Sequence, residues 1–320
     1  MLVLSRAEVE ELLDPHALIE AVASAMVELS AGRASMPPRI AAMIPEHDAL
    51  LGAMPAYLPS AGVLACKLVD VFPENASLGM DTHQAVVACF DPENGTPLAV
   101  MDGAAIKAQR TAAGSALATR LLARDDARVL AIVGTGAQAR THAAYVPRVR
   151  TFREVRLAGR TPERVAAMAT SLTLEGREAT ACRSVQEAVD GADVVCLCTH
   201  SPAPVIRRAW LSDGAHVNSV GLNVHGPEVD AGTVRDALVV VEHRGSSLSP
   251  PPSGPADLQG LGPEDVVEIG ELVAGTRDGR SSPGRLTLYR SAGVAVQDAA
   301  AAGVVLRRAN ETGAGRTVEI

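Results

Sequence analysis

The chain comprises 320 residues, of which 47% are hydrophobic and only 2% aromatic, and its formal net charge is −8. This length allows two domains with aliphatic cores, and the acidic balance, with no basic block and few aromatic rings, argues against a nucleic-acid or an anionic-membrane partner. Five scattered cysteines, a charged N-terminal segment and the lack of any apolar run of about 20 residues predict a cytoplasmic protein without a membrane span.

The first 120 residues predict a domain that mixes helices and strands. Residues 6–32 carry apolar side chains at helical spacing, interrupted by Pro15. Short strands are then predicted at residues 50–58, 63–72, 84–91 and 96–103. The Asn-Gly dipeptide within DPENGTP (91–97) predicts a hairpin turn. A helix over residues 104–123 leads into the second half of the chain.

From residue 128 onward, strand-like and helix-like segments alternate, as expected for a parallel sheet with helices on both faces. Pro162 and Ser184 indicate the starts of two helices. The predicted strands are six: residues 128–133, 154–159, 178–183, 193–199, 216–222 and 237–243. The fold class is therefore α/β, with a Rossmann-type doubly wound sheet over residues 121–290. A second, α+β domain covers residues 1–120 and is completed by residues 291–320, whose helix (291–309) should return to the N-terminal half.

The segment RVLAIVGTGAQA (128–139) is an apolar strand that ends in Gly-x-Gly-x-x-Ala. Gly134 would make a tight turn, and Gly136 would let the backbone approach a pyrophosphate at the N-terminus of the next helix. Glycine pairs also occur in ordinary turns, so a purely structural turn is the alternative. The strand before the motif and the helix-forming run after it favour a dinucleotide site made of Gly134, Gly136, Ala137, Gln138 and Ala139.

With these motifs in order, the chain resembles the ornithine cyclodeaminase and mu-crystallin family over nearly its whole length. The matching segments are residues 36–40, 51–59, 66–75, 90–103, 109–119, 133–139, 159–164, 218–223, 268–275 and 287–302. The resemblance implies a homodimer in which the N-terminal half and the C-terminal helix serve dimerisation and substrate binding. It also implies hydride transfer between a nicotinamide and a carbon that bears nitrogen and a carboxylate.

Three cations match the family's carboxylate-binding residues: Arg39, Lys67 and Arg110. Guanidinium groups bind carboxylates bidentately and so fix the orientation of the reacting carbon. Lys67 is unusual because it stands alone within the apolar run VLACKLVDVF, and it is also a candidate catalytic residue. The alternatives are a lysine that extends its ammonium group to water and, for Arg110, a surface ion pair.

The choice of cofactor depends on the end of the second Rossmann strand, where an acidic residue binds the ribose of NAD and an arginine accommodates the 2′-phosphate of NADP. Arg160 and Thr161 occupy that place, with Arg164 one helical turn further on. This favours NADP(H), with NAD(H) possible; alternatively, Arg160 only caps a loop. Further residues at family positions near the cofactor are Thr82, Thr111, Gly221, and Ser291 and Gly293 in the predicted C-terminal helix.

Asn223 stands where cyclodeaminases of the family carry an aspartate that handles the substrate amine. A carboxamide can hydrogen-bond an amine or imine but cannot take up a proton near neutral pH, so this position favours reduction over deamination. If the alignment slips by a few residues, Glu228 or Asp230 would supply the carboxylate. His83, next to Gln84, is a candidate proton donor, with His225 as a substitute; a structural histidine is the alternative for His83.

The sequence therefore predicts an imino-acid (ketimine) reductase or amino-acid dehydrogenase that transfers hydride to a C=N carbon next to a carboxylate, on a small imino- or amino-acid substrate. One alternative is cyclodeamination of a diamino acid with release of ammonia. Another, of a different class, is an NADPH-binding carrier without turnover. No metal site is predicted, because no histidine, cysteine and acidic side chains fall at ligand spacing.

Overall fold

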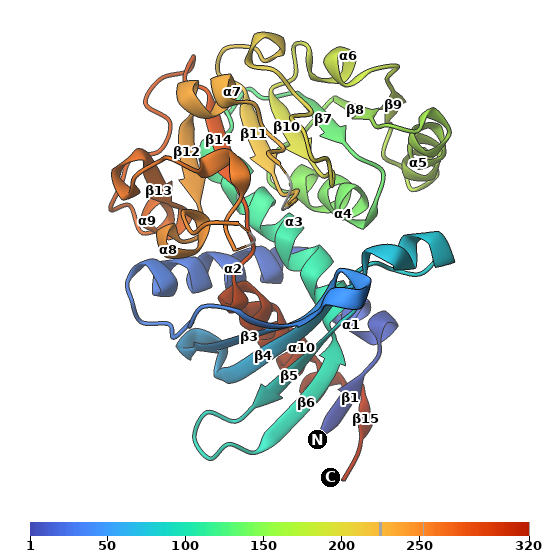
Figure 1. The fold of residues 1–320 in the computed structure, drawn as a ribbon, viewed down its shortest axis with the longest axis vertical. Coiled ribbons are helices and arrows are strands. Elements are labelled where there is room, and N and C mark those ends of the chain that lie inside the picture. Colours follow the sequence, from blue (N-terminus) through green and yellow to red (C-terminus); the bar gives the residue numbers. More distant parts are fainter. Residues whose placement is uncertain (224–225, 252, 320) are drawn as a thin grey trace. The chain divides into compact units, whose positions relative to one another are not determined.

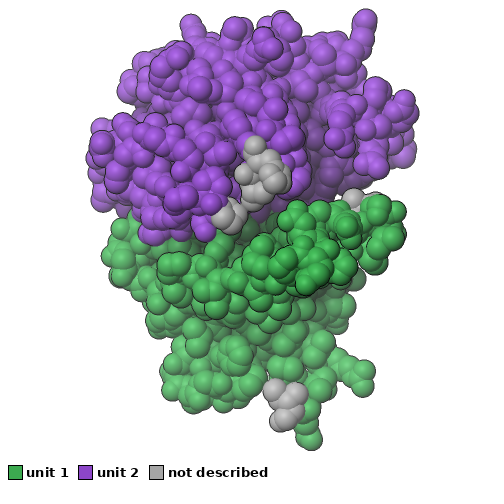
Figure 2. Space-filling view, in the orientation of Figure 1, with its two compact units in different colours: residues 1–110, 294–320 green, residues 111–293 purple. Residues whose placement is uncertain are grey.

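The computed structural model describes residues 1–223, 226–251 and 253–319. The chain forms two compact units, coloured separately in Figure 2: unit 1 contains residues 1–110 and 294–320, and unit 2 contains residues 111–293. The division therefore lies inside helix α3 (Gly103–Leu122), between Arg110 and Thr111, rather than near residue 120.

Unit 1 contains a seven-stranded mixed sheet in the order β15-β1-β6-β5-β4-β3-β2 (Figure 1). Strands β2 to β6 pair antiparallel with their neighbours, and β1 pairs parallel with β6. Their bounds are β1 Leu2–Leu4, β2 Ile40–Ile44, β3 Ala49–Leu58, β4 Val63–Val71, β5 Ala85–Phe90, β6 Pro97–Asp102 and β15 Arg316–Thr317. The four predicted strands and the hairpin turn are present. The sequence missed β1 and β15, which are too short for periodicity, and β2, whose side chains are mostly exposed and so do not alternate.

Helices α1 (Arg6–Leu12), α2 (Pro15–Ser30) and α10 (Ala295–Thr312) complete unit 1. Pro15 occupies the first turn of α2, where its missing N–H costs nothing, and the Asp14 side chain accepts a hydrogen bond from the Ala17 N–H. Helix α10 packs against α2 and against β3, β4 and β5. The C-terminal helix thus returns to the N-terminal part of the chain, as the sequence predicted.

Unit 2 contains an eight-stranded parallel sheet in the order β13-β12-β14-β11-β10-β7-β8-β9. The strands are β7 Val129–Val133, β8 Glu154–Ala158, β9 Thr180–Ala181, β10 Val194–Leu197, β11 His216–Ser219, β12 Leu238–Val241, β13 Val266–Glu268 and β14 Thr287–Arg290. The helices are α4 Ala137–Tyr145, α5 Pro162–Leu174, α6 Val185–Val189, α7 Ala231–Asp236, α8 Arg244–Ser247 and α9 Ile269–Val273. The Rossmann-type prediction is confirmed, but six strands were expected. The two that were missed are the three-residue β13 and the four-residue β14.

Strand β7 is buried on both faces of the sheet of unit 2. Val129, Ala131 and Val133 belong to one hydrophobic cluster, and Leu130 and Ile132 belong to another. Such a strand has a continuous apolar sequence, because neither face meets water. The strand order reverses direction between β7 and β10, with β8 and β9 on one side and β10 and β11 on the other. In open parallel sheets, ligands bind at the carboxyl ends of strands at this kind of switch point. Among the described residues, no helix combines the length and apolar character needed to cross a bilayer.

Candidate active site

Unit 1 buries an ion cluster in which Asp298 of α10 holds Lys67 of β4 and Arg110 of α3. The Lys67 Nζ lies 2.6 Å from Asp298 Oδ2, and the Arg110 Nε lies 3.0 Å from Asp298 Oδ1. The side chains are 3%, 5% and 2% exposed for Lys67, Arg110 and Asp298, respectively. Alternation along β4 explains the position of Lys67, because Val63, Ala65 and Lys67 are buried whereas Leu64 and Leu68 are exposed.

Gln297 adds a polar group to this cluster. Its Oε1 accepts a hydrogen bond of 3.0 Å from Arg110, and the residue is only 1% exposed. This bond fixes the amide orientation, and its Nε2 is buried without a hydrogen-bond partner among the described residues. A buried donor that lacks an acceptor is costly, so the amide of Gln297 suits a ligand with an acceptor oxygen.

Two further cations act on the cluster electrostatically. Burial lowers the pKa of Lys67 to about 8; Asp298 opposes this effect, whereas Arg110 and Arg39 add to it. Burial likewise lowers the pKa of Lys107 to about 8, with Lys67 and Arg110 as repelling neighbours. Burial alone would raise the pKa of Asp298, but its two cationic partners more than offset this and hold it below the ordinary value. Positive charge is therefore in excess.

The structure brings together Lys67 and Arg110, as predicted, and Arg39 acts on Lys67. The sequence analysis missed their shared partner Asp298, together with Gln297 and Lys107. A signal was present, since Asp298 is the single acidic residue in the Ala- and Val-rich first three turns of the last helix. Lys107 precedes Arg110 by three residues on α3, a spacing that places both on one face of a helix.

Thr82 and His83 also belong to unit 1, in the segment between β4 and β5. The Thr82 Oγ1 and His83 Nδ1 lie 3.0 Å apart, and both residues are half-buried. The backbone of Thr82 is held to the end of β4, because its carbonyl accepts a hydrogen bond of 2.9 Å from the Phe72 N–H. The hydroxyl and imidazole are thus coupled in this segment.

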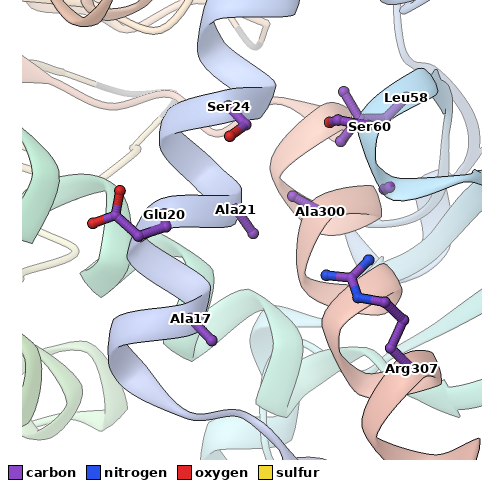
Figure 3. A pocket seen from close by; sticks show the side chains of 9 residues that line it. Ala17, Glu20, Ala21, Ser24, Leu58, Ser60, Ala300 and Arg307 are labelled. Atoms are coloured by element: carbon purple, nitrogen blue, oxygen red, sulfur yellow. The ribbon is translucent and has the colours of Figure 1, made fainter.

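Unit 1 also has a pocket of about 250 Å³ that none of the predicted site residues lines. Figure 3 shows its lining residues on α2, on α10 and in the segment from Leu58 to Ala61. Small side chains, Ala17, Ala21 and Ala300, leave the space, and Glu20 and Arg307 supply the charge. The ion cluster is therefore a separate feature from this pocket.

The glycine turn of unit 2 follows β7 at the switch point of the sheet. Gly134 has φ +127°, and a Cβ there would lie 2.5 Å from the carbonyl oxygen of Cys198, so no side chain fits. Gly136 precedes α4 with no side-chain cap, and a Cβ there would meet open space. Ala137, Gln138 and Ala139 form the first turn of α4, whose N–H groups are available to an anion. The turn therefore fits a pyrophosphate.

The predicted ribose-phosphate residues follow β8, which pairs parallel with β7 and ends at the same edge of the sheet. Arg160 is exposed, Thr161 precedes α5 as its N-cap residue, and Arg164 is exposed in the first turn of that helix. Gly159 lets the connection between β8 and α5 lie close to the glycine turn, because a Cβ at Gly159 would lie only 3.3 Å from the Thr135 methyl group.

Gly221 follows β11 and packs on the buried carboxylate of Glu228. Glu228 Oε2 accepts hydrogen bonds from the Ser219 hydroxyl (2.7 Å) and the Gly221 N–H (2.9 Å). Oε1 accepts from the hydroxyl (2.6 Å) and N–H (2.9 Å) of Thr199. Burial raises the pKa of Glu228, although Arg290 and these hydrogen bonds oppose the effect. Both oxygens are therefore already engaged within unit 2.

Asn223 is half-buried, and its Nδ2 donates a hydrogen bond of 3.0 Å to the His200 carbonyl oxygen. Asp230 precedes α7 as its N-cap residue, and its carboxylate accepts bonds from the Arg208 N–H (3.3 Å) and the Thr233 hydroxyl. The carboxylates of Glu228 and Asp230 thus both accept hydrogen bonds within unit 2, and His225 lies outside the described residues.

Ser291 and Gly293 were expected in the C-terminal helix, but the structure corrects this. Helix α10 begins at Ala295, after the N-cap residue Val294, so both residues precede it. Glu242 holds the segment: it accepts bonds from the Ser291 hydroxyl, from the Ala292 N–H (3.0 Å) and from the Gly293 N–H (3.2 Å). The reason is Gly293 itself, whose φ of +74° is incompatible with a right-handed helix.

Thr111 is buried on α3, as the first residue of unit 2. Among the described ranges, no group of three or more His, Cys, Asp and Glu side chains is placed to hold a metal ion. The cysteines in these ranges are free thiols.

Comparisons with known proteins show which family the chain belongs to. The ketimine reductase mu-crystallin of Mus musculus is 36% identical over 307 residues, which are 94% of this chain and 95% of that protein. The solved structure of the Thermococcus litoralis Δ1-pyrroline-2-carboxylate reductase, in complex with NADH and L-proline, is 33% identical, with a TM-score of 0.93. It covers 99% of this chain and 100% of that one.

An archaeal alanine dehydrogenase dimer with bound NAD is 30% identical, with a TM-score of 0.90, covering 100% of this chain and 99% of that one. The family model described as the ornithine cyclodeaminase/mu-crystallin family matches residues 1–313. The chain therefore belongs to the ornithine cyclodeaminase/mu-crystallin family.

Proposed function

We propose that this protein is an NAD(P)H-dependent reductase that converts a small imino acid into an amino acid. The observation that carries the proposal is the buried cluster of Lys67, Arg110 and Asp298, with the unsatisfied amide of Gln297 beside it. The cations of this cluster suit the carboxylate of the substrate, and the glycine turn suits the cofactor that would reduce its C=N bond. The relatives named as ketimine and pyrroline-2-carboxylate reductases support the same reaction class.

Each residue of the cluster has a distinct role in this proposal. Arg110 and Arg39 bind the carboxylate of the substrate, which orients the neighbouring imine carbon. Lys67, held by Asp298, contributes to this binding and donates the proton that the imine nitrogen gains. The pKa of Lys67 is lowered to about 8, which suits a general acid near neutral pH. An ammonium group with a lower pKa is a stronger acid and gives up its proton more readily. His83 and Asn223 are candidates for further hydrogen bonds to the reacting nitrogen.

The glycine turn of unit 2 is the proposed cofactor site, because the uncapped start of α4 and the open space at Gly136 fit a pyrophosphate. A bound nicotinamide cofactor would supply the hydride. We propose that Arg160, Thr161 and Arg164 favour NADP(H), and that NAD(H), which is present in the structures of two relatives, also binds. The remaining proposed cofactor contacts are Thr82, Thr111, Gln138, Gly221, Ser291 and Gly293.

Reduction is favoured over cyclodeamination because the chain has an amide, Asn223, at the position of the amine-handling aspartate. The hydrogen bonds that Glu228 and Asp230 accept within unit 2 support a structural role for these two carboxylates. Cyclodeamination requires a base that handles the substrate amine and ammonia, whereas imine reduction requires one proton and one hydride.

We further propose that the protein is a homodimer that places the exposed face of the unit 1 sheet against a second copy. On the face opposite to Lys67, Leu64, Leu68 and Val86 are 40%, 38% and 43% exposed. They form cross-strand pairs, Tyr57 with Leu64 and Leu68 with Val86, so the apolar surface is continuous over three strands. An apolar surface of this kind usually marks a protein interface. The dimeric alanine dehydrogenase relative supports the homodimer. We also propose a cytoplasmic location, with which the five scattered cysteines of the sequence agree.

The reaction is tested by incubating the purified protein with NADPH or NADH and Δ1-pyrroline-2-carboxylate, with linear imines formed from 2-oxo acids and methylamine as a second panel. We expect stoichiometric cofactor oxidation and formation of the amino acid. Ammonia released from ornithine with catalytic NAD would instead show cyclodeamination. Tight NADPH binding without oxidation by any imine would show a carrier. Light scattering of the wild type and of Leu68→Asp tests the dimer.

A further inference from the structure

The chain contains only two lysines among its 29 lysine and arginine residues. Lys67 is part of the ion cluster of unit 1, and Lys107 interacts electrostatically with that cluster. Everywhere else in the sequence, a basic side chain is an arginine. Lys67 is buried between Asp298 and the other cations, and Lys107 is half-buried on α3. The use of lysine at these two positions alone suggests that they need a property that arginine lacks.

Arginine and lysine differ in two respects that matter here. The guanidinium group binds carboxylates bidentately and stays protonated at all accessible pH values, whereas a buried ammonium group titrates readily. A side chain that only anchored a substrate acid group would be served better by arginine. Lysine at both positions therefore indicates proton transfer. The pKa values of Lys67 and Lys107, both lowered to about 8, agree with this role.

The position of Lys107 makes it a suitable partner for Lys67. It precedes Arg110 by three residues on the same face of α3, and Arg110 contacts the same carboxylate as Lys67. Of the charged groups that act on Lys107, Lys67 has the largest effect, followed by Arg110 and Asp298. Lys67 itself is 3% exposed, so it has almost no direct contact with solvent, whereas Lys107 is half-buried.

We propose that Lys107 reprotonates Lys67 after each turnover, so that the two lysines form a proton relay from solvent to the substrate nitrogen. This inference rests on the proposed reductase function, in which Lys67 is the proton donor. The inference adds Lys107 to the reaction, because the immediate proton donor, Lys67, is buried and needs a route to solvent.

The proton balance is simple. Imine reduction consumes one hydride, from the reduced nicotinamide, and one proton, from the Lys67 ammonium, whose N–H bond breaks as the amine N–H bond forms. Neutral Lys67 then takes a proton from the Lys107 ammonium, directly or through water, and Lys107 recovers a proton from solvent. Asp298 keeps Lys67 in place throughout.

The test compares the wild type with Lys107→Arg and Lys107→Met in steady-state NADPH oxidation with Δ1-pyrroline-2-carboxylate. Lys107→Arg retains the positive charge but cannot give up a proton, and Lys107→Met removes both properties. Arg120→Met, in the last turn of the same helix, is the matched control. We expect at least a tenfold lower kcat at pH 7 in weak buffer for both Lys107 variants and little change for the control. NADPH binding and thermal unfolding report whether each variant is folded.

Chemical rescue separates a relay from a structural role. Tertiary amine buffers, which cannot condense with the substrate, should restore kcat in Lys107→Met in proportion to their concentration and leave the wild type unchanged. The pH profile gives a second readout. Lys67 faces Lys107 and Arg110 from α3, Asp298 from α10, and Arg39. Removing one of these positive charges in Lys107→Met raises the pKa of Lys67 and moves the alkaline limb to higher pH, whereas Lys107→Arg leaves it in place.

A wild-type kcat in Lys107→Arg would overturn the relay and leave Lys107 as a charge alone, for example as an anchor for a second acid group on the substrate. A loss in Lys107→Met that no amine buffer restores would also overturn it. If the wild type reduces no imine, then the proposed function itself is wrong, which is a different outcome from either of these.

Discussion

The two units both bury clusters of charge, but they balance them in different ways. In unit 2, the cation Arg290 has its Nε 2.7 Å from Asp257 Oδ1 and also acts on the carboxylate of Glu228, and a third buried carboxylate, Glu242, holds the segment that follows Arg290. In unit 1, the single carboxylate of Asp298 contacts two cations, Lys67 and Arg110. Two further cations, Arg39 and Lys107, interact electrostatically with this cluster. One cluster is therefore rich in acid and the other is rich in base.

The difference shows that the count of charges does not by itself mark a ligand site. The carboxylates of unit 2 accept bonds from backbone N–H groups and hydroxyls at the carboxyl ends of the strands, which neutralise them locally. Their role is to hold the connections that follow β10, β11 and β14. In unit 1, Lys67 and Arg110 share the single carboxylate of Asp298, and Gln297 adds a buried donor without an acceptor among the described residues. Unit 1 is the cluster that favours an anionic ligand.

The sharpest test of this comparison is Asp298→Asn set against Glu228→Gln. Asp298→Asn leaves two buried cations without their acid, which should cost about 3–5 kcal/mol in the free energy of unfolding. Glu228→Gln keeps half of its acceptor capacity and should cost about 1–3 kcal/mol. Urea denaturation measures both. Added acetate should restore stability to Asp298→Asn alone, because the anion can replace the missing carboxylate beside the two cations. Equal restoration in both variants would contradict the distinction.

The pH dependence has a defined sign. Because the pKa of folded Asp298 is lowered, its stabilisation is complete above about pH 4 and is lost as the pH falls further. The wild type should therefore lose more stability on acidification than Asp298→Asn does.

Arg110→Leu tests whether the unit 1 cluster binds the substrate. Loss of a buried, charge-assisted contact should lower kcat/KM for the imino acid about 100-fold, or about 3 kcal/mol of transition-state stabilisation. Arg308→Leu, at an exposed ion pair on α10, is the control and should change little. Kinetics close to the wild type in Arg110→Leu would remove this residue from the substrate site.

Two glycine substitutions separate folding from cofactor binding in unit 2. Gly134→Ala should impair both, because its Cβ would lie 2.5 Å from a backbone oxygen at φ +127°. Gly136→Ala meets open space, so stability should change by no more than about 1 kcal/mol. NADPH affinity should still fall at least tenfold, because the methyl group occupies the space proposed for the pyrophosphate. Unchanged affinity, measured by fluorescence titration, would place the phosphates elsewhere.

Arg160→Asp should have the smallest effect, about a tenfold shift in the ratio of kcat/KM values from NADPH toward NADH. Arg160 is exposed, so its substitution should leave the free energy of unfolding unchanged. An unchanged ratio would show that Arg160 does not contact the 2′-phosphate.

The sequence predicted those features that a local pattern encodes. The glycine turn, the start of α4, Pro162 at the start of α5 and the Ser184 cap all follow from short-range backbone requirements, and all are present. Strand β13 was missed because α9 begins at the next residue, with no turn to mark the end of the strand. Strand β14 was missed because only two of its four residues, Leu288 and Tyr289, are apolar. The Gly293 conformation was missed because the Ala-rich segment that follows it is strongly helical and the helix was extended back to Ser291.

By itself, the sequence determined the α/β class and the glycine turn, because buried strands and turns are visible along the chain, and its resemblance to the family pointed to Arg39, Lys67 and Arg110. Only the tertiary structure decided what those cations contact. Asp298 lies 231 positions from Lys67 and 188 from Arg110, so no local spacing relates them. They meet because α10 returns to cover the sheet of unit 1, where a buried ammonium and guanidinium require a carboxylate to offset the loss of water.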